Sequence, residues 1–476
     1  MAEGPEGRAG GEGGLPLEVR EEFRRRDIQI GGGATPFAYR RDQLLLPAGQ
    51  VRAAERSRTF RDRRLLADAE PLEASDGAIV RVRVEQACDV ERELCDRGVP
   101  ARLNHVVFSG VGPTWSANPA YQGNPAYQGN PAYQGNPAYQ GNPAYQGNPA
   151  YQGNPAYQGN PAYQGNPVQA VSTAIAATPL PAWQRQEGGG PLIAVLDTGL
   201  QTDGEPSSEP YVPGTTRTVR HAALRAHSPM PETWRLSPLD HDPRCDEDIP
   251  DENEDGFLDR AAGHGTFIAG ILARLCPSAE IRCEGAMSSF GDGDDFTMAA
   301  ALGEVLAEGR PCLINLSFGG YSEHDEPPAA MRDILRRHVG PDDETVVVAS
   351  AGNDGTCRPS WPAAFDGVIA VGALSDGGQP AWFTNWGHWV DACAPGVDVV
   401  STFLHHDGVK VRGRTHERFE GWASWSGTSF AAPKVVAAIA REMVATGASP
   451  REAARRVVHA HGLYRMPNLG TLVNLV

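Results

Sequence analysis

The sequence predicts an α/β fold in which helices flank a mainly parallel central sheet. Three short apolar runs have the length and composition of buried strands, at 192–196, 312–316 and 346–349. Two longer segments are typical of helices, one at 267–275 and an alanine-rich one that ends near residue 443. Because strands without a polar face need cover on both sides, these runs favour a parallel sheet between helices.

A serine lies where small residues give way to the alanine-rich helix, in the segment Gly427 to Pro433. Gly427 allows a tight turn of the backbone, and the first N–H groups of the helix lie beside Ser429. Since a helix start favours developing negative charge, Ser429 is a candidate nucleophile. Helix capping, a role that serine fills well, is the structural alternative.

A carboxylate and an imidazole occupy similar positions elsewhere in the sequence. The first apolar run ends in Asp197, at the end of a strand where parallel-sheet proteins build their sites. His264 lies between two glycines at the start of the 267–275 helix. Taken alone, Asp197 is explained equally well as a capping or turn residue, and His264 as a buried core or capping histidine. Together with Ser429 they provide a base and an orienting carboxylate for serine catalysis.

The order Asp197, His264, Ser429, each in its own small-residue motif, resembles the subtilisin-like serine proteases, the subtilases. The strand at 346–349 continues into Ser-Ala-Gly-Asn, and in that family the matching asparagine donates its side-chain amide to the oxyanion. The resemblance implies that Asn353 and the backbone N–H of Ser429 form the oxyanion hole, at roughly 3 kcal/mol per donor. Alone, Asn353 reads as a turn residue.

The same resemblance implies where a peptide substrate binds. Subtilases pair the substrate with a Ser-x-Gly segment, and they form a wall of the specificity pocket from the Ser-Ala-Gly before the oxyanion asparagine. An edge strand can hold a peptide by main-chain pairing, although an ordinary strand end is the alternative. These substrate-binding roles fall on Ser317, Phe318, Gly319, Ser350, Ala351 and Gly352.

Two positions depart from the family pattern. Phe267 stands where many members have a second histidine, and Phe430 where methionine is common. Neither position supplies a catalytic group, so the resemblance implies a serine endopeptidase that works through an acyl-enzyme and needs no organic cofactor. The alternative is a catalytically silent protein of the same fold that tethers a partner.

A tandem repeat divides the chain. The hexapeptide Asn-Pro-Ala-Tyr-Gln-Gly recurs eight times without variation from Asn118 to Gly165. Each unit has one proline, one glycine and one large side chain, too little apolar area to offset the cost of ordering. We expect a flexible, disordered spacer that spans roughly 40 Å root-mean-square. A partner-binding arm built on the repeated Tyr and Gln is the alternative.

A small α+β domain is expected before the spacer, with strands at 42–46, 78–84 and 101–108 and helices at 48–56 and 88–97. Its position ahead of a subtilase resembles that of a propeptide, which would act as an intramolecular inhibitor that is later removed. A permanent adaptor domain is the alternative. The expected organisation is a flexible segment at 1–33, the small domain at 34–110, the spacer at 111–170 and the peptidase domain at 171–476.

An acidic loop before His264 matches the start of a calcium-binding pattern. Oxygen donors alternate along it and a glycine, Gly256, stands at the sharp turn, but position twelve is Ala262 rather than a carboxylate. A solvated acidic loop explains the same residues. The candidate calcium ligands are Asp251, Asn253, Asp255 and Asp259.

Composition and charge limit the partners. A chain of 476 residues usually forms two or three domains, and its 40% hydrophobic content supports a large core. The net charge of −17 argues against a nucleic acid or an anionic membrane as partner. No apolar run approaches the roughly 18 residues that span a bilayer.

The cysteines and the N-terminal segment bear on location. Eight cysteines are too few for a disulfide scaffold in this chain, and no spacing resembles a zinc site, so free thiols are expected. One or two disulfide bridges are the alternative if the protein is exported. Residues 1–33 contain no apolar stretch typical of a secretory signal. The default expectation is a cytoplasmic protein, or a secreted one if the start is misassigned or export is non-classical.

Overall fold

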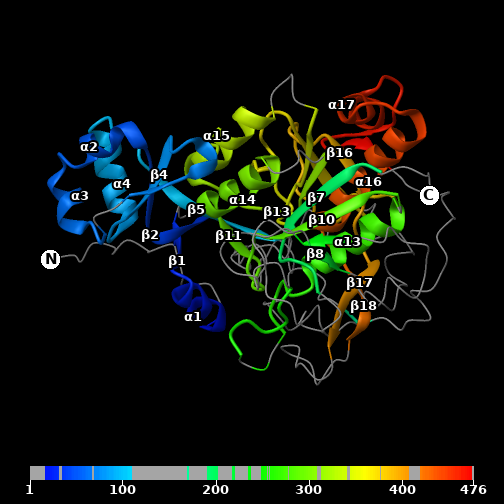
Figure 1. Cartoon of the computed structure of the whole chain (residues 1–476), viewed down its shortest axis with the longest axis horizontal. Helices are drawn as coiled ribbons and strands as arrows, with labels where there is room; N and C mark the ends of the chain where they lie inside the picture. Colours follow the sequence, from blue (N-terminus) through cyan, green and yellow to red (C-terminus); the bar gives the residue numbers. More distant parts are fainter. Residues whose placement is uncertain are drawn as a thin grey trace, which may run out of the picture.

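The structure is a computed structural model of the chain. The residues that it describes are 17–31, 35–66, 69–109, 169–170, 190–201, 217–219, 234–236, 248–254, 256, 258–276, 278–307, 312–339, 344–375, 377–406 and 419–473. The hexapeptide repeats lie outside the described residues, so their role as a spacer stays a prediction. We call residues 17–109 the N-terminal domain and residues 190–473 the C-terminal domain (Figure 1).

The N-terminal domain is an antiparallel sheet with helices packed on it, as the α+β pattern predicts. The pairing order is β5-β2-β4-β3, and β1 joins β2. The predicted 48–56 helix is divided into a 3-10 turn at Ala48–Gln50 and a short α-helix. The strands are β1 (Ile28–Gly31), β2 (Phe37–Pro47), β3 (Glu70–Pro71), β4 (Ile79–Arg83) and β5 (Arg102–Ser109), and the helices are α1 (Leu17–Arg25), α2 (Val51–Ala54), α3 (Arg58–Arg63) and α4 (Ala87–Asp96).

The start of this domain differs from the expectation of a flexible segment at 1–33. Helix α1 and strand β1 both lie within it. Phe23 and Ile28 are buried in the core of the N-terminal domain and anchor the two elements. In the sequence these apolar residues are hidden among arginines and glutamates, which is why the segment reads as unstructured.

The C-terminal domain is built on the mainly parallel sheet that the sequence predicts. Its strand order is β19-β20-β16-β15-β14-β12-β7-β10-β9-β8, and only the β19–β20 and β8–β9 pairs at the two edges are antiparallel. The strands are β7 (Leu192–Asp197), β8 (Arg217–Val219), β9 (Trp234–Leu236), β10 (Glu280–Gly285), β12 (Leu313–Leu316), β14 (Val346–Ser350), β15 (Val368–Leu374), β16 (Ala392–Pro395), β19 (Arg465–Met466) and β20 (Gly470–Leu472).

Helices cover both faces of this sheet (Figure 1). Ile193 and Val195 of β7 belong to the apolar cluster of α13 and α16, and the alternate residues Ala194 and Leu196 belong to that of α14 and α15. Burial on both faces explains why the strands read as continuous apolar runs. The helices are α13 (His264–Leu275), α14 (Asp295–Ala307), α15 (Ala329–His338), α16 (Thr428–Thr446) and α17 (Pro450–Ala454), and a smaller sheet joins β17 (Val399–His406), β18 (Phe419–Trp425) and β6 (Gln169–Ala170).

Strand β5 connects the two domains. One stretch of it pairs with β2 of its own domain, and its end pairs antiparallel with β11 (Asp292–Asp294) and β13 (Phe318–Gly319) of the C-terminal domain. The end of the N-terminal domain thus lies as a strand between two segments of the C-terminal domain (Figure 1).

Candidate active site

Asp197 and His264 meet at the carboxyl edge of the central sheet. Strand β7 ends at Asp197, and helix α13 begins at His264. The His264 Nδ1 atom lies 2.6 Å from Asp197 Oδ1, which also accepts a hydrogen bond from the Thr198 amide at 2.9 Å. Both side chains are buried, and His264 Nε2 has no hydrogen-bond partner among the described residues. The carboxylate therefore fixes the ring and directs Nε2 away from itself.

A second buried carboxyl holds the start of α13. Asp248 accepts hydrogen bonds from the Gly263 amide at 2.8 Å and from the Thr266 hydroxyl at 2.9 Å. Burial raises the pKa of Asp248 to about 7. Gly263 has a φ of 81°, and a Cβ there would clash with the Phe403 ring. The sequence analysis missed Asp248, whose only signal is its place in an acidic run.

Aromatic rings enclose the imidazole. The His264 ring lies 5.5 Å from Trp425 in an edge-on arrangement and 5.3 Å from Phe430. The two residues that depart from the family pattern contact each other, because the Phe267 and Phe430 rings lie 4.6 Å apart. Both fill an apolar shell around the histidine and neither offers a polar atom.

Ser429 lies in the first turn of α16, next to Phe430, as predicted. Its hydroxyl donates to the carbonyl oxygen of Ser317 at 3.1 Å, and the Ser317 hydroxyl donates to the carbonyl oxygen of Ser429 at 2.8 Å. The hydrogen bond of the Ser429 hydroxyl thus goes to Ser317 and not to the imidazole. The structure brings Asp197 and His264 together and places Ser429 one residue from a ring that contacts His264.

Asn353 lies beside the start of the same helix. Its Oδ1 accepts hydrogen bonds from the amide and the hydroxyl of Thr428, both at 2.9 Å, and the Gly352 amide donates to the Thr428 hydroxyl at 3.1 Å. Thr428, which the sequence analysis did not single out, therefore connects the start of α16 to the segment that follows β14. Gly352 has a φ of 102°, and a Cβ there would clash with Asn385, so glycine is required.

The residues predicted to bind substrate face the end of β5. Phe318 pairs with Ser109 and Gly319 with Phe108. A cavity of about 20 Å³ at this place is lined by Phe108, Ser109, Gly319, Ser350, Gly352 and Asn353, among others. Ala351 is fully buried, and its carbonyl accepts a hydrogen bond from Asn385 at 2.9 Å.

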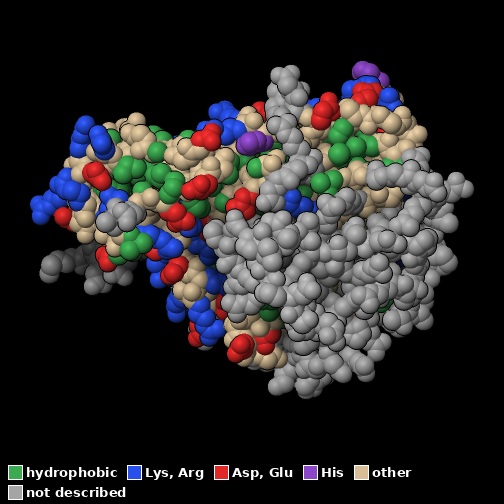
Figure 2. Space-filling view, in the orientation of Figure 1, with side chains coloured by type: hydrophobic (Ala, Val, Ile, Leu, Met, Phe, Trp, Pro, Cys, Tyr) green, Lys and Arg blue, Asp and Glu red, His purple; other side chains and the backbone are tan. Residues whose placement is uncertain are grey.

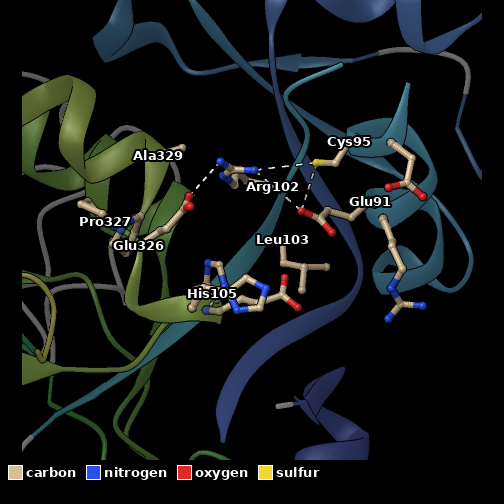
Figure 3. Close-up of a pocket in the computed structure, with 13 residues that line it drawn as sticks. Glu91, Cys95, Arg102, Leu103, His105, Glu326, Pro327 and Ala329 are labelled. Carbon is tan, nitrogen blue, oxygen red and sulfur yellow. Dashed lines mark hydrogen bonds and ion pairs between the residues drawn. The ribbon is translucent and has the colours of Figure 1, made fainter. Parts of the chain in front are cut away.

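A larger cavity of about 230 Å³ lies where α4 and β5 face the segment before α15 (Figure 3). Arg102 pairs there with Glu326 at 2.8 Å, and the Cys95 thiol donates to Glu91 at 3.4 Å. At its edge the buried His105 accepts a hydrogen bond from the Glu323 amide at 3.1 Å. Burial lowers the pKa of His105 to about 3.

The described part of the predicted calcium loop turns its oxygens toward protein donors. Asp259 accepts from the Glu252 amide and the Ser289 hydroxyl, both at 2.7 Å, and Asp251 accepts from the Gly256 amide at 2.8 Å. Asp255 lies outside the described residues. Among the described residues no group of three His, Cys, Asp or Glu side chains is placed to hold a metal ion, and calcium binding stays a prediction.

Two further expectations concern the cysteines and the membrane. The seven cysteines of the described ranges are not paired in disulfides, and Cys245 lies outside those ranges. Among the helices that the structure describes, none has the length and apolar character needed to cross a bilayer. The location of the protein stays a prediction.

Comparisons with known proteins identify a family. A model described as "Subtilase family" matches residues 188–468. The chain is 28% identical over 286 residues to Subtilisin Savinase of Lederbergia lenta, covering 57% of this chain and 84% of that protein. It is 26% identical over 297 residues to an extracellular protease of Xanthomonas campestris, covering 57% of this chain and 47% of that protein.

A third relative is a thermophilic serine proteinase of Bacillus sp. strain AK1. It is 34% identical over 182 residues, which cover 36% of this chain and 40% of that protein. The chain thus spans less than half the length of two of these three relatives.

Proposed function

The chain belongs to the subtilase family, and from this premise we propose that it is a serine endopeptidase that hydrolyses peptide bonds through an acyl-enzyme. The observation that best supports the proposal is the 2.6 Å contact between His264 Nδ1 and Asp197 Oδ1. It lies next to a helix whose first turn carries a serine, and this set of groups is the one that serine catalysis needs.

In the proposed reaction Ser429 Oγ attacks the carbonyl carbon of the substrate while His264 Nε2 takes the hydroxyl proton. Asp197 accepts the Nδ1–H bond and stabilises the imidazolium. The imidazolium then gives its proton to the leaving amine, and a water activated by the same imidazole hydrolyses the acyl-enzyme. For the first step the Ser429 hydroxyl has to leave the Ser317 carbonyl and turn to Nε2. Such hydrogen bonds often form only with substrate present.

The oxyanion would be bound by Asn353 and by the backbone N–H of Ser429. Asn353 Oδ1 accepts hydrogen bonds from Thr428, so the side-chain NH₂ of Asn353 points away from Thr428. This NH₂ group would donate to the oxyanion. We expect Asn353→Ala to lower kcat about 10²- to 10³-fold with little change in KM, because the donor acts on the transition state.

Thr428→Val is the matched control for this prediction, since it removes one anchor of Asn353 and leaves the donor in place. It should cost much less than Asn353→Ala in steady-state kinetics on the same peptide. A rise in KM at unchanged kcat for Asn353→Ala would contradict the oxyanion role.

The N-terminal domain is proposed to inhibit the site until it is removed. Its strand β5 pairs with β11 on one side and β13 on the other, and the Ser109 amide donates to the Gly291 carbonyl at 2.7 Å. A peptide substrate needs the same main-chain partners, so the two compete. Release requires a cut between Phe108 and the end of the repeats.

Acid should weaken the hold of the cut N-terminal domain. His105 is neutral in its buried place against Glu323, near the positive Arg102 and Arg358, and its pKa there is about 3. In the released domain the ring regains a pKa of about 6.5, so below that pH only the released state gains a proton. Binding is unaffected above about pH 6.5 and weakens by about 1.4 kcal/mol per pH unit from there toward pH 3.

Gel filtration of the cut wild-type protein between pH 7.5 and pH 5 measures this effect. The N-terminal fragment should elute with the C-terminal domain at the higher pH and separate at the lower one. His105→Gln retains an acceptor for the Glu323 amide without a titrating group, so its fragment should stay bound over the whole range. The same separation in both proteins would exclude His105 as the cause.

Labelling with a fluorophosphonate tests the proposed function. After removal of the N-terminal domain, mass spectrometry should find one adduct on Ser429. Protein with His264 intact that forms no adduct would favour the catalytically silent binding protein.

A further inference from the structure

Two carboxylates stand beside the strand that occupies the proposed substrate position. Asp292 lies opposite Phe108 and Asp294 opposite Val106 in the antiparallel pairing of β11 with β5. Directly opposite residues share a face of the sheet, with their Cβ atoms about 4.5 to 5.5 Å apart. Asn104, two residues before Val106, donates to Asp294 at 3.0 Å, which confirms that this face of β5 reaches the carboxylates.

Guanidinium groups of the N-terminal domain fill the space in front of these carboxylates. Arg40 donates from Nε to Asp294 and from Nη2 to Asp292, both at 3.0 Å. Arg26, directly after α1, donates to Asp292 at 3.0 Å. The surface over α1 is correspondingly dense in basic and acidic side chains (Figure 2). The site therefore already holds a ligand of defined chemistry, an arginine side chain.

The C-terminal domain supplies no cation of its own to the pair within the described chain. Its hydrogen bonds to these carboxylates come from neutral donors, the Ser288 hydroxyl to Asp292 at 2.5 Å and the Thr297 amide to Asp294 at 3.0 Å. Asp292 and Asp294 are 5% and 3% exposed in the assembled protein. Departure of the N-terminal domain would remove every guanidinium named here and leave two negative groups at the edge of the cleft.

We propose that Asp292 and Asp294 then form an acidic subsite that selects peptides with arginine at the position that Phe108 occupies in β5. The inference rests on the proposed function, because it names the substrate class of the same cleft. A substrate strand in the register of β5 presents that side chain directly opposite Asp292. Arginine is favoured over lysine because the guanidinium fork reaches two carboxylates at once, as Arg40 does.

The register and the packing agree on this position. The Phe108 ring stacks on Phe23 of α1 at 5.9 Å, and Phe23 stands three residues before Arg26 in the sequence. The side chain at the Phe108 position therefore points to the region where Arg26 meets Asp292. With the N-terminal domain gone, both Phe23 and Arg26 are absent and an arginine of the substrate has room to replace them.

The test uses peptides copied from residues 104–115 with arginine or citrulline at the position of Phe108, since citrulline has the same shape and no charge. The enzyme is the full chain after removal of its N-terminal domain. The wild type should hydrolyse the arginine peptide with a kcat/KM roughly ten- to a hundredfold higher, the range expected for a hydrogen bond to a charged group. Asp292→Asn should bring the ratio close to one.

Two further variants separate the subsite from general effects. Asp294→Asn keeps an oxygen for the Thr297 amide and should also lower the ratio. Asp333→Asn is the matched control, because Asp333 lies on α15 and pairs with Arg337 of the same helix at 2.7 Å, and it should leave the ratio unchanged. A wild-type ratio near one, or a ratio that survives Asp292→Asn, would overturn the proposal.

A binding measurement tests the same preference for arginine over citrulline without catalysis. A recognition site for an unrelated protease, placed in the repeats, allows the N-terminal domain to be cut off in the Ser429→Ala chain and then separated. In fluorescence anisotropy the arginine peptide should bind at least about tenfold more tightly than the citrulline peptide, and Asp292→Asn should abolish the difference. Absence of hydrolysis with this preference intact would contradict the proposed function alone. Equal binding of both peptides would refute the subsite.

Discussion

Replacing Ser429 by alanine is expected to lower kcat for peptide hydrolysis by about 10⁶-fold, because the substitution removes the proposed nucleophile that forms the acyl-enzyme. The same variant should stay at full length, whereas the wild type cuts itself between Phe108 and the end of the repeats. Residual activity would reflect substrate binding and the oxyanion donors, which the substitution leaves in place. Fluorogenic peptide kinetics and intact-mass spectrometry measure the two effects.

Ser426→Ala is the matched control for this result. Ser426 lies three residues earlier, and its hydroxyl accepts a hydrogen bond from the Asp398 amide at 2.8 Å. This variant should retain both hydrolysis and self-cleavage. If Ser429→Ala still hydrolyses peptides, Ser429 is not the nucleophile. If the wild type hydrolyses peptides while the wild-type and Ser429→Ala chains both stay uncut, the N-terminal domain is not an inhibitor that has to be removed.

Replacing Asp197 by asparagine should lower kcat by about 10⁴-fold with the fold intact. An asparagine in this place directs an NH₂ group or a neutral oxygen at His264 Nδ1, so the ring loses both its fixed tautomer and the charge that stabilises the imidazolium. The Thr198 amide keeps an acceptor if the oxygen faces it, which limits the loss of stability. Steady-state kinetics and a thermal unfolding curve of the same sample separate catalysis from folding.

Asp248→Asn provides the comparison for Asp197→Asn. Asp248 is also buried beside α13, but its oxygens bond to Gly263 and Thr266 and not to the imidazole. Its pKa of about 7 means that it is partly neutral at pH 7, so a neutral substitute changes less. We expect a far smaller loss of kcat. Equal losses in the two variants would show that Asp197 acts by supporting the helix.

The sequence predicts the parts of this molecule whose signal is local. The strands at 192–196 and 346–349 are apolar throughout because the sheet is covered on both faces, and helix α13 begins at the histidine that two glycines flank. Motifs at the ends of these elements placed Asp197 and His264, and the structure brings both into contact.

Features that depend on contacts between residues far apart in the chain could not be predicted from local sequence signals. The pairing of Phe108 with Asp292 joins residues from two domains, and neither segment contains a sequence motif that predicts it. Asp248 supports α13 from an irregular segment with no motif of its own. The rotamer of Ser429, which turns its hydroxyl to Ser317, depends on packing around a buried helix start.

A crystal structure of the C-terminal domain with a peptide boronate bound to the active site tests the proton relay most directly. The account predicts a covalent bond to Ser429 Oγ, with that oxygen turned from the Ser317 carbonyl to within hydrogen-bond distance of His264 Nε2. A boronate oxygen should receive hydrogen bonds from the Asn353 amide and the Ser429 N–H. A boronate attached elsewhere, or an imidazole that faces neither Ser429 Oγ nor Asp197, would contradict it.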